Sequence, residues 1–138
     1  MPQFTMSTEV ALPYDAAVEA VRAELAEVGF GVLTEIDVAA TLKSKLDVDV
    51  APKIILGACR PQLAHQALQI DARVAALLPC NVVVSGIGGG SVVEVMDPAV
   101  MPEFTGAAEL SEVAEDARTR LRTMLDAVSA RAASAAAR

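Results

Sequence analysis

The alternation of apolar and polar residues in the first quarter of the chain predicts two strands with a helix between them. Residues 4–12 alternate, and their inward face would carry Phe4, Met6, Thr8 and Val10. Residues 16–28 repeat their apolar positions at helical spacing, with Asp15 as an N-cap and Gly29 as the C-terminal stop. Residues 30–38 predict the second strand, with Phe30, Val32 and Ile36 facing inward.

The middle of the chain predicts a short helix, a buried strand and a longer helix. Asp37 is placed to cap a helix that carries Leu42 and Leu46, four residues apart. The apolar run 53–59 indicates a strand buried on both faces, and Pro61 is typical of the first residue of the helix that follows.

Residues 81–85 and 91–96 predict two further strands joined by a glycine-rich segment, GIGGG. A phosphate-binding loop would be followed by a helix whose N–H groups face the anion. Here an alternating strand pattern follows instead, and no lysine comes after the glycines. The segment therefore predicts the tip of a β-hairpin.

Residues 109–128 carry the clearest helical pattern, and the Ala-rich residues 129–138 are expected to form a low-complexity tail. The elements run strand–helix–strand–helix–strand–helix–strand–strand–helix. This order predicts a single α+β domain over residues 1–128, with a mostly antiparallel five-stranded sheet and helices packed on one face.

Composition and charge narrow the classes of function. The 138 residues carry a net charge of −7, and a phosphate-binding surface would need clustered basic residues, so a nucleic-acid partner is not expected. Neither a membrane-spanning stretch nor a secretory signal is visible, so we expect a cytoplasmic protein with both cysteines reduced.

The two cysteines are the most reactive side chains that the pattern places together. If strands 53–59 and 81–85 are antiparallel neighbours, Cys59 and Cys80 lie at the same end of the sheet, with His65 in the helix between them. Thiols near a helix N-terminus can bind soft metals or act as nucleophiles. Buried cysteines more often serve as small apolar side chains, and this alternative stays open.

Glu35 and Asp37 fall on one side of the second strand, where paired carboxylates can exchange protons. Simpler roles are open to both, since Asp37 can cap a helix and Glu35 can pair with Lys43 or Lys45. No catalytic motif is recognised, and a closed zinc site cannot be assembled from two cysteines and one histidine. If any metal is bound, Cys59 and Cys80 are the candidate ligands.

Three blocks carry a resemblance to a known family: GFGVLTEIDVAATLKSKL (29–46), ILGACRPQLAHQAL (55–68) and LLPCNVVV (77–84). Together, over roughly residues 4–128, the chain is similar to the family catalogued as domain of unknown function 302. The resemblance implies a small α+β domain of the TATA-binding-protein fold type, usually a homodimer, and no established activity. Cys59, Cys80 and Lys45 fall on positions within these blocks, and His65 occurs in some members.

The chain departs from the family pattern at two positions. Arg60 stands where the family commonly has Asn, and Asp47 stands where it commonly has Gly. We expect a small homodimeric module that binds a small ligand or a protein partner, with Cys59, Cys80, His65 and Lys45 as candidate residues and no cofactor identified. The alternatives are a thiol-dependent or Cu(I)-type binding or redox protein and a purely structural dimerisation domain.

Overall fold

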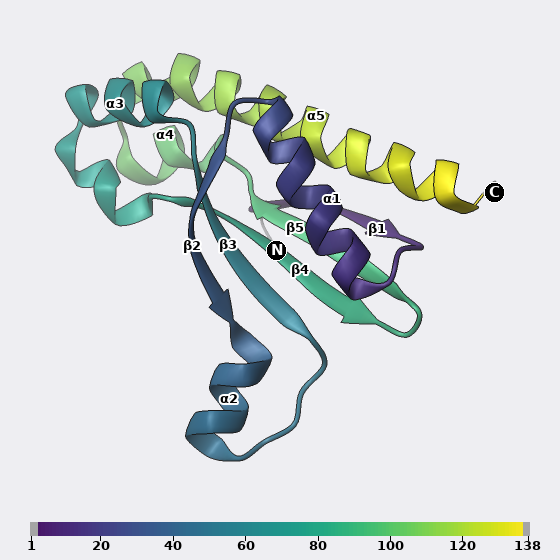
Figure 1. Ribbon diagram of the computed structural model, residues 1–138. Helices are drawn as coiled ribbons and strands as arrows, with labels where there is room; N and C mark the ends of the chain where they lie inside the picture. The colour runs from purple at the N-terminus through teal and green to yellow at the C-terminus, as the bar shows by residue number, and fades with distance from the viewer. Residues whose placement is uncertain (1–2, 137–138) are drawn as a thin grey trace.

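A five-stranded antiparallel sheet with helices across one face forms the centre of the computed structural model, which describes residues 3–136 (Figure 1). The strands lie in the order β1-β5-β4-β3-β2, and every neighbouring pair is antiparallel. The predicted α+β class is therefore confirmed. The strands are β1 (Thr5–Val10), β2 (Gly31–Asp37), β3 (Lys53–Cys59), β4 (Cys80–Ile87) and β5 (Gly90–Met96).

The helices follow the predicted order, with three short additions before the last one. The helices are α1 (Tyr14–Glu27), α2 (Val38–Leu46), α3 (Pro61–Ile70), α4 (Val100–Thr105) and α5 (Ser111–Ala136), and the 3-10 turns are η1 (Ala72–Leu77) and η2 (Ala108–Leu110). The sequence did not predict α4, η1 or η2, because segments of three to six residues are too short to show a helical period.

The core lies between the sheet and the two helices α1 and α5. Side chains from alternate positions of the inner strands meet the apolar stripes of both helices, as Leu56, Val82 and Val93 do. Leu25 of α1 and Leu121 of α5 are fully buried against them. Each such side chain contributes about 1.5–3 kcal/mol. Between Gln3 and Ala136, no helix combines the length and the hydropathy needed to cross a bilayer.

The glycine-rich segment forms the tip of the β4–β5 hairpin, as predicted. Ile87 pairs with Gly90, and Gly88 adopts a φ of +53° in the turn. Gly90 is required for a second reason, since a Cβ there would lie 2.8 Å from the carbonyl oxygen of Val10. The tip can therefore pack against the end of β1 only without a side chain at residue 90.

The boundaries of the two long helices differ from the prediction. α1 begins at Tyr14, so Asp15 is not an N-cap. It lies in the first turn, where its negative charge interacts favourably with the positive end of the helix dipole. α5 continues through the expected tail to Ala136. Ala132 is only 6% exposed, and Arg131 Nε donates to Glu24 at 2.5 Å, so the alanine-rich turn stays on α1.

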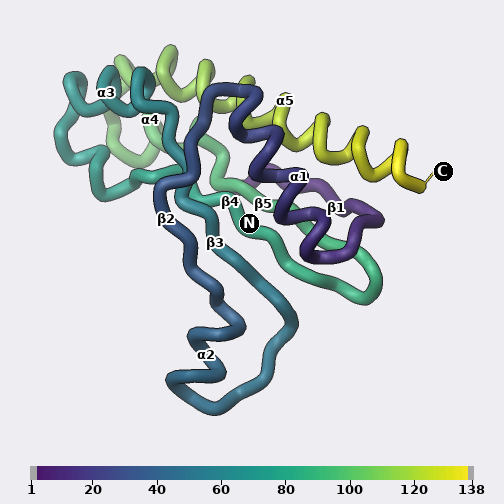
Figure 2. The backbone as a smooth tube through the Cα atoms, viewed as in Figure 1, coloured from purple at the N-terminus to yellow at the C-terminus, as the bar shows by residue number. Residues whose placement is uncertain are grey.

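The edge strand β2, α2 and the segment 47–52 form an arm at one side of the molecule, and α2 projects from the body (Figure 2). The register of β2 on β3 shifts between Val32 and Thr34, so one extra residue sits in β2. A one-residue bulge reverses the side-chain faces beyond it. Ile36 was predicted to face inward, and this was wrong: it lies on the open face of the sheet and is 49% exposed. Phe4, also predicted inward, precedes β1 and is 62% exposed.

Asp37 caps α2 as predicted, accepting a hydrogen bond from Ala40 N at 2.8 Å. The helix ends at Asp47, whose φ of +55° lies in the left-handed region. Glycine is the residue that most readily takes this conformation at the end of a helix, because a Cβ is disfavoured there. Asp47 adopts it with an exposed ion pair to Lys43 at 3.0 Å.

We predict that Asp47→Gly raises the free energy of unfolding by about 1 kcal/mol, because glycine relieves the left-handed strain. The exposed ion pair to Lys43 that is lost contributes little. Urea denaturation would measure the change. Asp49→Gly is the matched control, since Asp49 also pairs with Lys43 at 3.3 Å but has no positive φ. An equal gain in both variants would contradict the explanation.

Candidate functional site

The candidate site lies at the end of the sheet where β3 finishes and β4 begins. Ala58 pairs with Cys80 in an antiparallel register, so Cys59 lies next to Cys80 across the two strands. This confirms the predicted antiparallel arrangement of residues 53–59 and 81–85. Cys59 is half-buried and Cys80 is buried, and both are free thiols.

A small cavity of about 30 Å³ lies at this end of the sheet, between β3, β4, α3 and α5. Both cysteines line it, together with Phe30, Leu63 and Met101. Helices α3 and α5 each contribute small side chains where they face one another, so they leave space instead of filling it. These side chains are Ala64, Ala67, Ala114 and Ala117.

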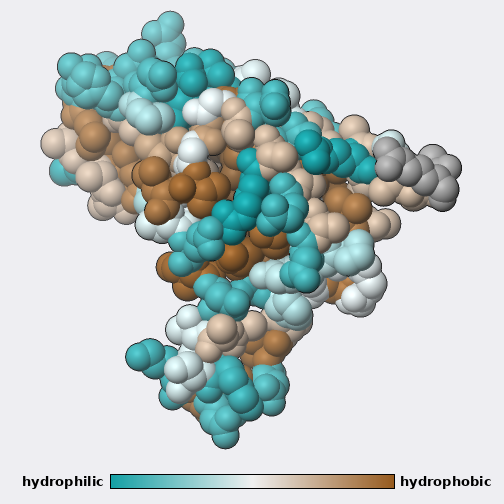
Figure 3. Space-filling model, in the orientation of Figure 1, coloured by the Kyte–Doolittle hydropathy of each residue, from teal (hydrophilic) through white to brown (hydrophobic). Residues whose placement is uncertain are grey.

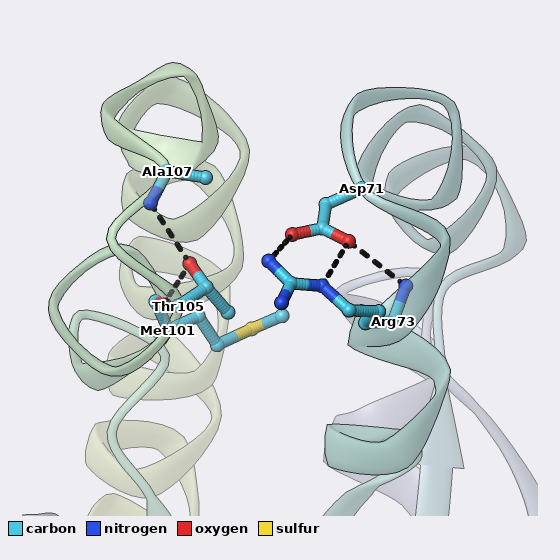
Figure 4. Close-up of polar contacts among 5 residues, drawn as sticks. All are labelled: Asp71, Arg73, Met101, Thr105 and Ala107. Atoms are coloured by element: carbon cyan, nitrogen blue, oxygen red, sulfur yellow. Dashed lines mark hydrogen bonds and ion pairs between the residues drawn. The ribbon is translucent and has the colours of Figure 1, made fainter.

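Two local hydrogen-bond clusters, shown in Figure 4, hold η1 and the end of α4, the helix whose Met101 lines the cavity. Asp71 accepts from the backbone N–H of Arg73 at 3.0 Å and from its guanidinium at 2.8 and 3.1 Å. These bonds lower the pKa of Asp71 to about 2. Thr105 Oγ1 donates to the carbonyl of Met101 at 2.8 Å and accepts from Ala107 N at 3.1 Å. They fix η1 and α4, which carry Val74 and Met101 into a second apolar cluster.

The environment of the two thiols makes both of them weaker acids. Burial raises the pKa of Cys59, and burial together with the neighbouring Cys59 raises the pKa of Cys80 to about 11. The nearby start of α3 therefore does not produce the low pKa that would activate a thiolate. At neutral pH both side chains are protonated, and they behave as small apolar lining.

The structure does not bring the other two candidates to this cavity. His65 lies on the exposed side of α3, and it is not among the residues that line the cavity. Lys45 lies in α2, which follows the opposite end of β2, so the length of the β2–β3 ladder separates it from Cys59. Within residues 3–136, no group of three or more His, Cys, Asp and Glu side chains is arranged to hold a metal ion.

The carboxylate pair of β2 also has structural partners. Glu35 pairs with Arg22 of α1 at 2.7 Å. Asp37 is the N-cap of α2, as its bond to Ala40 shows. Neither of these arrangements is that of a proton-transferring pair.

Arg60 also lines the cavity, and it was not among the site residues predicted from the sequence. It is half-buried, and its Nε is buried without a hydrogen-bond partner among residues 3–136. Its Nη1 lies against Gly29, at the place that a Cβ on Gly29 would take. Arg120 approaches the same glycine from α5. A sequence signal existed, since no acidic residue stands within four positions of Arg60 to pair with it.

Comparison with known proteins agrees with the fold. The family model described as domain of unknown function DUF302 matches residues 6–128. A solved structure, the uncharacterized conserved protein DUF302 from Bacillus stearothermophilus, is similar to this chain with 29% identity and a TM-score of 0.86. The match covers 92% of this chain and 99% of that one. No curated protein matches the chain.

We predict an alkaline loss of stability that depends on Cys80. Folding raises its pKa from an ordinary value of 9.0 to about 11, so ionisation favours the unfolded chain. The stabilisation is complete below pH 9 and is lost as the pH rises through 11, with a total of about 2–3 kcal/mol.

Urea denaturation between pH 8 and pH 11 would measure this loss in the wild type and in Cys80→Ala. The variant should lose less stability over the same interval, whatever its stability at pH 8. Parallel pH dependences in the two proteins would show that the buried thiol does not titrate as described.

Proposed function

For this chain, which belongs to the family described as domain of unknown function DUF302, we propose the role of a binding module for a small ligand that acts as a homodimer. The family description itself assigns no activity. The ligand site in this proposal is the cavity lined by Cys59 and Cys80. The observation that carries it is the apolar space left between the facing alanines of α3 and α5.

An unfilled apolar space is costly in a protein interior, where side chains pack as densely as in organic crystals. The enclosed volume of about 30 Å³ is close to that of one water molecule or one methyl group, and the cavity is open to solvent at its edge. Water would find few hydrogen-bond partners there, because the lining is aliphatic, aromatic or sulfur-bearing apart from Arg60. An apolar hollow of this size, with one polar group at its open edge, suits the end of an aliphatic group whose remainder lies at the mouth of the cavity.

Thiol chemistry fits this site less well than binding does. A nucleophilic or metal-binding cysteine needs its thiolate, and burial disfavours the thiolate of both Cys59 and Cys80. Two unpaired thiols suit a reducing compartment, so the proposal places the module in the cytoplasm.

The arm formed by β2, α2 and the segment 47–52 supports the homodimer. Within the described part of the chain, α2 buries none of its nine residues. An isolated helix of this length is marginal in water. The arm exposes large aliphatic side chains that find no cover in the chain: Leu33 (67%), Ile36 (49%), Leu46 (66%), Val48 and Val50. Figure 3 shows apolar surface on the arm and where it joins the body.

The charge of the arm favours a second copy of the chain as its partner. Residues 38–50 contain Lys43 and Lys45 against Asp47 and Asp49, so this segment is neutral in a chain of net charge −7. Two acidic copies repel each other least where each is neutral. A two-fold axis would place the same aliphatic patch of each copy against its counterpart.

We predict that the cavity binds a neutral probe, 3-methylbutanol, at saturable concentration. Methyl chemical shifts of Leu63 and Met101 in NMR titrations would report its occupancy, since both side chains line the cavity. Ala64→Leu should abolish the shifts, because the larger side chain fills the space from a half-buried position. Gln62→Leu, an exposed position of α3, is the control. Unsaturable shifts, or equal shifts in Ala64→Leu, would reject the cavity as a ligand site.

We predict that Leu46→Glu weakens dimerisation at least tenfold, as judged by sedimentation velocity over a range of protein concentrations. A buried leucine contributes about 1.5–3 kcal/mol, and a symmetric interface loses it twice. Ser44→Glu adds the same charge to the same helix at an exposed polar position. A wild type that stays monomeric, or equal weakening by both variants, would refute the arm as the dimer contact.

A further inference from the structure

We propose that the ligand of this cavity is a small carboxylate with a short aliphatic tail, whose charge is bound by Arg60. This inference rests on the proposed function, since it assigns the chemical class of the ligand to the same cavity. The tail would lie among Cys59, Leu63 and Ala64, where the lining is apolar. The carboxylate would lie at the edge, beside the guanidinium.

Arg60 carries the argument because its charge is not compensated. Its Nε is a buried side-chain donor without a partner, the single such atom among residues 3–136. None of the ion pairs among these residues includes Arg60. A buried donor left unsatisfied is unfavourable, more so on a charged group. A ligand that accepts hydrogen bonds from the guanidinium would remove this cost.

The surroundings of Arg60 favour an anion over a neutral acceptor. Arg60 and Arg120 both approach Gly29, so two guanidinium groups lie on the same side of that residue. Arg120 is occupied, since it bonds Asp116 at 2.6 Å and the carbonyl of Val28 at 3.1 Å. Asp116 therefore neutralises Arg120, and no salt bridge in residues 3–136 neutralises Arg60. An unpaired guanidinium attracts a carboxylate more strongly than it attracts a neutral acceptor.

Gly29 positions the guanidinium. Its φ of +83° ends α1, and a side chain there would collide with Arg60 Nη1. The guanidinium of Arg60 therefore packs directly against the backbone of Gly29, and the same side chain lines the cavity. A planar guanidinium held in this way can donate two parallel hydrogen bonds to a carboxylate.

The size and lining of the cavity limit the tail. An enclosed space of about 30 Å³ takes the terminal methyl of an aliphatic tail, and the rest of a short tail would lie in the open mouth of the cavity. The neutral thiols add to the apolar lining, so a tail is bound by contact and exclusion of water. A tailless anion would leave this space empty.

The test compares four probes by the same NMR titration at pH 7.5: 3-methylbutanoate, the near-isosteric 3-methylbutanol, acetate and inorganic phosphate. The wild type should bind 3-methylbutanoate at least tenfold more tightly than the alcohol and both tailless anions. Arg60→Gln should bring the carboxylate and the alcohol to similar affinity, and Arg60→Lys should restore part of the preference. Arg122→Gln removes the same charge from α5 outside the cavity lining and should leave the preference unchanged.

The outcomes separate the two proposals. If the alcohol binds as tightly as the carboxylate in the wild type and in Arg60→Gln, the cavity binds ligands and the assignment of the carboxylate is wrong. If acetate or phosphate binds as tightly as 3-methylbutanoate, the cavity does not recognise an aliphatic tail, and that part of the proposal is wrong. If no probe binds, the proposed function fails with it. A further outcome combines no preference for any anion with a shift of the monomer–dimer equilibrium that is larger in Arg60→Gln than in Arg122→Gln. Arg60 would then pair with an acidic group of a second copy, and the small-ligand assignment would be overturned.

Discussion

The antiparallel register of β3 on β4 is the constraint on which the candidate site depends. Ala58 lies opposite Cys80, so the chain leaves β3 at Cys59 beside the point where it re-enters the sheet at Cys80. Everything between these two residues, namely α3 and η1, must close as one loop over the end of the sheet. The cavity forms under that closure, where α3 meets α5 through alanines and not through larger side chains. Shifting the register by one residue would turn Cys80 to the other face and remove the site.

A second backbone feature, the bulge in β2, explains the surface of the arm. Before the bulge, Val32 faces the helices; after it, Ile36 faces away from them. Without the extra residue, Ile36 would be inward and the open face of the arm would be more polar. An isoleucine exposed on an edge strand favours aggregation unless another surface covers it. The proposed dimer is one way in which the chain can satisfy that requirement.

The sequence predicted the elements well and their surroundings poorly. Strong local signals determined the hairpin at Gly88, the cap at Asp37 and the start of α3 at Pro61, because turn and cap chemistry depends on neighbouring residues alone. The face of Ile36 depends on a bulge, for which the alternating pattern gives no sign. The last two turns of α5 depend on contacts to α1 through Ala132 and Arg131, which alanine-rich composition does not reveal.

The same division explains why two cysteines drew attention and Arg60 did not. Residue type alone suggests chemistry for a thiol, but burial decides its pKa, and burial is a tertiary property. Arg60 breaks two local rules at once: it stands at an N-cap position without capping α3, and it places an unpaired donor in the interior. Natural sequences tend to tolerate such conflicts where function requires them. Arg60 therefore gives this chain a charged edge on an otherwise apolar cavity.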